Sequence, residues 1–202
     1  MYFNENAFQW DTPERLRRAN ILAERIREHW GTNELTTVLE FGCGTGAISY
    51  ALGDRAENFL GFDTAEKMLS IYRQKADSSR HRAVENLADV GAGTVDAVVT
   101  SMVLHHVPDV PDTLATLAEK LRPGGLLTVI DLDARCEFFH QDMDVEVFHH
   151  GFDREEFSGS LRAAGLVVQR METMVEAVKA LKDGTEHPYS MFIVTASKPA
   201  AG

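Results

Sequence analysis

Residues 35–46 read LTTVLEFGCGTG, and this stretch decides the fold. Leu35–Phe41 is rich in apolar and β-branched residues, which is typical of a buried strand. Three glycines follow at alternate positions, Gly42, Gly44 and Gly46, before a helical pattern begins. Glycines at the carboxyl end of a strand let the backbone approach a ligand closely. The stretch therefore predicts an α/β protein with a ligand site at the edge of a parallel sheet.

The same alternation of strand and helix continues along the chain. Further strands are predicted at Asn58–Asp63, His81–Leu87, Thr94–Thr100, Leu126–Leu132, Leu166–Met171 and Ser190–Ser197. Helices are predicted from Pro13 to Trp30, from Ala47 to Leu52, from a cap at Thr64 to about Ala76, from Val110 to Leu121, and after Asp153. Apolar strands separated by helices indicate a seven-stranded, mostly parallel sheet with helices on both faces. Because no repeat or linker is visible, residues 1–202 are predicted to form a single domain.

The net charge of the chain indicates which kinds of molecule it can bind. The chain has 20 Lys and Arg against 31 Asp and Glu, a formal net charge of −11. This balance opposes the phosphate backbone of nucleic acids, so no nucleic acid is expected. The basic cluster Arg15, Arg17 and Arg18 is interpreted as the solvated face of a helix. A small neutral or cationic substrate is therefore favoured.

Apolar runs and cysteines indicate the compartment. Nothing approaches the roughly 18 apolar residues of a membrane span, and the N-terminus lacks the basic start and apolar run of a signal peptide. Cys43 and Cys136 are too few for a disulfide framework. A cytoplasmic protein that does not contact membranes is expected.

An acidic residue follows the second predicted strand. Asp63 lies 23 residues after Glu40, at a place where a carboxylate can accept both ribose hydroxyls of a nucleoside. The glycine spacing is G-x-G-x-G, whereas a nicotinamide-binding loop reads G-x-G-x-x-G and meets a pyrophosphate. A lone aspartate there is more often a cap or turn residue. Coupled to the glycine loop, Asp63 favours a nucleoside ligand without pyrophosphate.

These motifs resemble those of a known family. EFGCGTG with Asp63 is similar to motif I and the following acidic position of class I S-adenosylmethionine (SAM)-dependent methyltransferases. The segments 101–109 (SMVLHHVPD) and 121–125 (LRPGG) resemble the quinone-biosynthesis-like branch. The segments FQWDTPERLRRANILA and VFHHGFDREEF resemble small, mostly uncharacterised bacterial and archaeal members. The resemblance spans nearly the whole chain and implies a Rossmann-like SAM methyltransferase fold.

The resemblance implies a role for each residue of the loop. Gly42, Gly44 and Gly46 would line the methionine and ribose parts of SAM. Glu40 would support the loop or the amino group, and Asp63 would bind the ribose hydroxyls. Neighbouring Cys43 is interpreted as a small packing residue at this cofactor site, because no basic partner that could activate the thiol is visible nearby.

The resemblance extends to the adenine and sulfonium ends of the cofactor. Thr64 and Met68 would flank the adenine, and Ser101 and Met102 would lie beside the sulfonium. The family often has an aspartate after the third strand that holds the adenine amino group. This chain has Glu85-Asn86 there, either of which could substitute.

Histidines are the candidate catalytic residues. Methyl transfer needs a base only when the nucleophile starts protonated, and histidine suits that task. His106 follows the fourth strand, while His149 and His150 lie in the irregular segment 133–151, which is predicted to be a substrate lid. The alternative is that these histidines pack or hold the loop backbone.

The segment 133–151 also contains candidate metal ligands. His140, His149 and His150 occur near three acidic residues, Asp142, Asp144 and Glu146. Zinc-binding patterns such as H-E-x-x-H are absent, so no metal is expected.

The first 31 residues are predicted to form a cap-helix region. Trp10 and Phe8, which precede the first helix, could cover the cofactor or belong to the core.

Together these features predict a SAM-dependent methyltransferase that produces S-adenosylhomocysteine and methylates an unidentified small molecule by in-line displacement. A non-catalytic SAM-binding protein and, with less support, a nicotinamide-dependent oxidoreductase are the competing hypotheses. The oxidoreductase hypothesis is weakened by the missing pyrophosphate loop.

Overall fold

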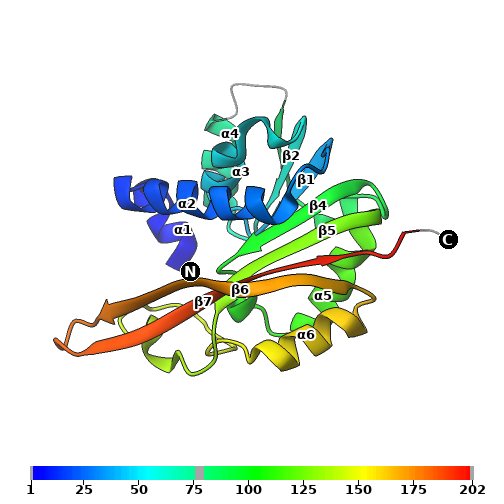
Figure 1. Ribbon diagram of the computed structural model, residues 1–202. Helices are drawn as coiled ribbons and strands as arrows, with labels where there is room; N and C mark the ends of the chain where they lie inside the picture. Colours follow the sequence, from blue (N-terminus) through cyan, green and yellow to red (C-terminus); the bar gives the residue numbers. More distant parts are fainter. Residues whose placement is uncertain (1, 76–79, 201–202) are drawn as a thin grey trace.

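The computed structural model describes residues 2–75 and 80–200 (Figure 1). Its strands are β1 (Thr37–Phe41), β2 (Asn58–Phe62), β3 (His81–Val84), β4 (Val95–Ser101), β5 (Leu121–Leu132), β6 (Val167–Ala180) and β7 (Glu186–Ser197). Its α-helices are α1 (Tyr2–Asn6), α2 (Pro13–Trp30), α3 (Ala47–Leu52), α4 (Glu66–Lys75), α5 (Val110–Lys120) and α6 (Arg154–Ala163). Ala76, the predicted end of the fourth helix, lies outside the described residues, as do Met1, Ala201 and Gly202.

The strands form one seven-stranded sheet in the order β3-β2-β1-β4-β5-β7-β6. The first five of these strands are parallel to one another, whereas β7 runs antiparallel between β5 and β6. The α/β class and the seven-stranded, mostly parallel sheet are therefore confirmed. The chain order reverses between β1 and β4, and doubly wound sheets bind ligands at the carboxyl edge beside such a switch point.

Helices cover both faces of this sheet (Figure 1). Buried side chains of α2 and α3, including Ile26, Trp30 and Leu52, pack on one face against strand residues such as Val99 and Ile130. The helices α5 and α6 pack on the opposite face. No described helix is long and apolar enough to cross a membrane.

The helix α2 begins and ends as the sequence predicts. Thr12 caps it by accepting a hydrogen bond from the Arg15 backbone N–H at 3.2 Å, and Pro13 occupies its first turn. Leu16 of this helix is 40% exposed, whereas Leu22 is buried. Two shorter elements that were not predicted precede it, α1 and the 3-10 helix Ala7–Gln9.

Three strands are longer than predicted. β5 begins at Leu121 and includes the LRPGG segment, opposite a register irregularity between Val95 and Ala97 of β4. β6 continues to Ala180 and β7 begins at Glu186, so these two strands form a long hairpin. Its outer half projects beyond the rest of the sheet (Figure 1).

Candidate active site

The glycine loop sits at the carboxyl end of β1, and its glycines have different tasks. Gly42 and Gly46 have φ angles of +72° and +83°, and a Cβ added there would collide with the side chains of Val103 and Tyr72. Gly44 has a φ of +52°, but a Cβ there would meet only Trp10 Nε1, at 3.8 Å. Packing therefore requires the outer two glycines, whereas Gly44 borders open space that a ligand can fill.

Asp63 ends β2 and holds this loop. Its Oδ2 accepts a hydrogen bond from the Gly44 N–H at 2.7 Å, and its Oδ1 accepts one from the Ala65 N–H at 2.8 Å. Burial raises the pKa of this carboxyl above its ordinary value, although the backbone hydrogen bonds oppose that shift. A carboxylate offers about four lone-pair sites, so two remain for further donors, such as a pair of hydroxyls.

A cavity of about 570 Å³ opens beside the loop. This volume lies within the range of roughly 300–1,000 Å³ that small-molecule sites occupy. Most of the predicted site residues line it: Glu40, Gly42, Cys43, Gly44, Asp63, Thr64, Met68, Ser101, Met102 and His106. The structure thus gathers residues from the ends of β1, β2 and β4 around one space.

Met102 lies at the cavity with an unusual backbone. Its φ is +58°, a left-handed conformation that non-glycine residues seldom adopt. The Met102 N–H donates to the Ile130 carbonyl oxygen at 2.8 Å, which holds the residue in this conformation at the end of β4. Backbone strain of this kind is concentrated at functional sites.

The predicted residues Gly46, Glu85 and Asn86 are not part of the cavity lining. Gly46 is occupied by packing against Tyr72, as described above. Glu85 is paired with Arg73 at 2.7 Å, and the Asn86 side chain accepts a hydrogen bond from the Ala88 N–H at 3.0 Å. The residue of this segment that lines the cavity is Leu87.

His149 and His150 also lie outside the cavity lining. His149 Nε2 donates to the Val107 carbonyl oxygen at 3.0 Å, and its backbone N–H donates to the His105 carbonyl oxygen at 3.1 Å. His150 is exposed, and its carbonyl oxygen accepts from the Cys136 N–H at 2.9 Å. Both residues therefore hold the backbone of the segment 133–151, which was the alternative to a catalytic role.

The N-terminal region contributes residues that the sequence analysis missed. Asp11 accepts a hydrogen bond from Thr45 Oγ1 at 2.6 Å and forms an ion pair with Lys75. Lys75 also donates to the Thr45 carbonyl oxygen at 3.0 Å. Through these contacts Asp11 joins the chain before α2 to the glycine loop.

Aromatic and basic side chains of this region border the same cavity. Trp10 lines it, whereas Phe8 is 74% exposed and neither covers the cavity nor joins the core. Arg15 and Arg18 line it too, so the exposed face of α2 that the sequence predicts at these two residues also borders the cavity. The Arg15 guanidinium stacks on the Trp10 ring, and its Cζ is 3.8 Å from the ring centroid.

Two acidic groups beside the loop are perturbed by burial. Glu40 is only 4% exposed and accepts a hydrogen bond from the Ser49 N–H at 3.1 Å. Burial raises its pKa from about 4.5 to about 8, so the carboxyl is largely protonated in the ligand-free protein at neutral pH. Burial likewise raises the pKa of the Cys43 thiol well above its ordinary value, which fits a packing role.

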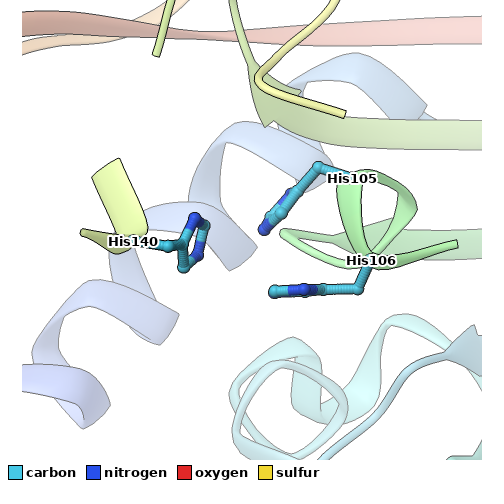
Figure 2. A group of neighbouring side chains, drawn as sticks. All are labelled: His105, His106 and His140. Atoms are coloured by element: carbon cyan, nitrogen blue, oxygen red, sulfur yellow. The ribbon is translucent and has the colours of Figure 1, made fainter. Parts of the chain in front are cut away.

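Three imidazoles lie together at the end of β4 and in the segment 133–151: His105, His106 and His140 (Figure 2). His105 is fully buried, and its Nδ1 is 2.6 Å from Asp131 Oδ1. Burial, followed by the charge of His105, lowers the pKa of His106. The same causes lower the pKa of His140 to about 3. His106 and His140 are therefore neutral at physiological pH.

Comparison with known proteins identifies the family. Residues 14–170 match the family described as methyltransferase domain. The chain belongs to the class I SAM-dependent methyltransferase family. The predicted family and fold are thereby confirmed.

Individual relatives agree with this assignment. A ubiquinone biosynthesis O-methyltransferase of Bordetella avium is 30% identical over 94% of this chain and 90% of its own length. An uncharacterized methyltransferase of Schizosaccharomyces pombe is 33% identical, and the match covers 62% of this chain. That match spans about half of the yeast protein.

Solved structures share the fold. A putative methyltransferase of Haloferax volcanii, solved in complex with the Trm112 methyltransferase activator, superimposes with a TM-score of 0.77. The superposition covers 98% of this chain and 97% of that chain, at 18% identity. At this identity the likeness concerns the fold alone.

Proposed function

We propose that this chain transfers the methyl group of SAM to a hydroxyl oxygen of a small molecule. The observation that carries the proposal is the cavity that joins the glycine loop and Asp63 on one side with the neutral imidazole of His106 on the other. The named O-methyltransferases among its relatives favour an oxygen acceptor. The net charge of −11 favours a small neutral or cationic acceptor over nucleic acid.

The residues of the cavity fit SAM. Gly44 leaves room for close approach, and Asp63 has free lone pairs for the two ribose hydroxyls. Arg15 and Arg18 are cations that suit the carboxylate of the methionine part, and Glu40 suits its ammonium. When bound, SAM supplies an electrophilic methyl group on a positively charged sulfur.

His106 is the base of the proposed reaction. Its Nδ1 is 2.6 Å from the Glu146 carbonyl oxygen and must donate to it, so Nε2 is left without a proton in the neutral ring. Nε2 accepts the proton of the acceptor hydroxyl while the oxygen attacks the methyl carbon. The oxygen–carbon bond forms, the carbon–sulfur bond breaks, and the sulfonium becomes a neutral thioether. The cavity walls contribute alignment, which can account for about 7–11 kcal/mol of the barrier.

The segment 133–151 remains a proposed lid. It brings His140 beside His106 and packs against the outer half of the β6–β7 hairpin, where Phe138 stacks on His187. None of the residues 133–151 lines the cavity in this structure, so the segment would have to close over the cavity when ligands bind, and closure would exclude water from the transfer. The two cysteines are free and buried, which fits the reducing cytoplasm that the sequence predicts.

Two measurements test the proposed function. S-adenosylhomocysteine at about 100 times its dissociation constant should add about 2.7 kcal/mol to the free energy of unfolding, and NAD should add nothing. Incubation of the protein and methyl-labelled SAM with a small-molecule extract should then label one metabolite at oxygen. Stabilisation by NAD alone would favour an oxidoreductase, and binding of SAM without any labelled product would favour a non-catalytic SAM-binding protein.

Asp63→Ala tests the placement of the cofactor. We expect the affinity for S-adenosylhomocysteine to fall about 10- to 150-fold, because a charge-assisted hydrogen bond contributes about 1.5–3 kcal/mol. Calorimetric titration measures the affinity, and Asp54→Ala, a change at an exposed aspartate outside the cavity lining, is the matched control. An Asp63→Ala protein that is folded and binds like wild type would show that the ribose lies elsewhere.

A further inference from the structure

The histidine cluster has the composition and shape of a metal site. One ring nitrogen from each of His105, His106 and His140 lies within 4.8 Å of the other two. His105 and His106 come from the 3-10 helix Leu104–His106, and His140 comes from the 3-10 helix Glu137–His140. Figure 2 shows the rings of the two helices facing one another across a small gap.

The outer hydrogen bonds of the cluster prepare two nitrogens as ligands. His105 Nδ1 donates to the Asp131 carboxylate and His106 Nδ1 donates to the Glu146 carbonyl oxygen, both at 2.6 Å. Each bond fixes the ring orientation and leaves Nε2 as the nitrogen with a free lone pair. Metal-binding histidines nearly always have such a partner on their other nitrogen.

The innermost of these nitrogens has no hydrogen-bond partner among residues 2–75 and 80–200. His105 is fully buried, and its Nε2 makes no hydrogen bond. A buried polar atom without a partner destabilises the folded protein. A ligand at the centre of the cluster would remove that destabilisation.

We propose that His105, His106 and His140 bind one divalent ion of zinc or of a neighbouring first-row transition metal. Three imidazoles suit zinc and its neighbours, whereas calcium and magnesium prefer oxygen ligands. Zinc–nitrogen bonds are roughly 2.0–2.1 Å long, so the nitrogens must draw together when the ion binds.

Three histidines would leave a fourth position on the ion for another ligand, and His106 is the member of the cluster that lines the cavity. This step rests on the proposed function, because the acceptor of the methyl group would occupy that part of the cavity. Coordination would lower the pKa of the acceptor hydroxyl and release its proton to solvent. In the metal-bound protein the ion would activate the acceptor, and the role of His106 Nε2 as the base belongs to the metal-free protein.

Metal titration tests the site without any need for turnover. Tag-free protein is dialysed against a chelator and then titrated with Co²⁺, followed by its visible absorption, and with Zn²⁺, followed by calorimetry. We expect one equivalent of each ion to bind to wild type. His140→Ala should weaken binding at least 10-fold, and Asp131→Asn should weaken it about 10- to 100-fold through the orientation of His105.

The controls separate this site from surface binding and from the proposed function. His187→Phe keeps the ring that stacks on Phe138 but removes its nitrogens, and it should leave both titrations unchanged. His140→Ala must keep the circular dichroism and the S-adenosylhomocysteine affinity of wild type. Absence of stoichiometric binding, or binding that His140→Ala leaves unchanged, would overturn the metal site. Failure of the wild-type protein to bind S-adenosylhomocysteine would instead overturn the proposed function.

Discussion

Replacing His106 by glutamine is expected to lower kcat for methyl transfer by about 100- to 10,000-fold, the usual contribution of a general base. Glutamine is similar in length and polarity but cannot take up a proton. Its affinity for S-adenosylhomocysteine should remain within a few-fold of wild type, because the cofactor contacts lie at the glycine loop and Asp63. Single-turnover assays of the metal-free protein, with methyl-labelled SAM and the acceptor found in the extract, measure the chemical step.

The pH dependence gives a second readout for His106. Its pKa is lowered by burial, so the wild-type rate should fall only when the pH drops below 6.5, and this acidic limb should vanish in His106→Gln. His149→Gln tests the competing histidine, and His187→Phe, which keeps the stacking on Phe138, is the neutral control. A normal rate in His106→Gln together with a large loss in His149→Gln would assign the base to the segment 133–151.

Glu40→Gln is expected to stabilise the ligand-free protein at alkaline pH. The unfolded-state pKa near 4.5 rises to about 8 in the folded protein, so the folded state must either hold a proton or bury a charge. The stability that Glu40 contributes is complete below pH 4.5 and is lost as the pH rises toward 8. At pH 9 the variant should unfold with a free energy greater than that of wild type by about 5 kcal/mol.

Chemical denaturation of both proteins between pH 5 and 9 measures this difference. The exposed Glu57 supplies the control Glu57→Gln, which should follow wild type at every pH. Cofactor binding should show the opposite dependence, because an ammonium group beside Glu40 favours the ionised form and binding then releases a proton. A difference in stability that does not change between pH 5 and 9 would contradict the proton-linked explanation.

Much of the fold could be predicted because its core elements carry strong local signals. The helix Pro13–Trp30 has a clear apolar period and a capping side chain at Thr12. The strands at the switch point have clear apolar runs, and Ala47–Leu52 lies between Gly46 and Gly53. The outer half of the β6–β7 hairpin was missed because its side chains are largely exposed and offer no apolar run. Asp183-Gly184 is a strong turn signal between the two strands and could have revealed the hairpin.

The site could be predicted only where one motif places several residues together. The glycine loop and Asp63 lie at adjacent strand ends, so topology alone brings them together. Arg15 and Asp11 reach the cavity from another element, and His140 meets His106 across 34 positions of the chain. Contacts of that kind depend on how helices and loops pack, and no local pattern encodes them.

The two ends of the chain differ in how they can be used in the laboratory. Phe3 lines the cavity, so a tag or fusion partner joined to the N-terminus begins at its wall. β7 is antiparallel to β5 and pairs Ser197 with Leu126, which places its end at the sheet edge opposite the glycine loop. Purification tags, fluorophores and surface tethers therefore belong after Lys198, where they leave the route of cofactor and acceptor open.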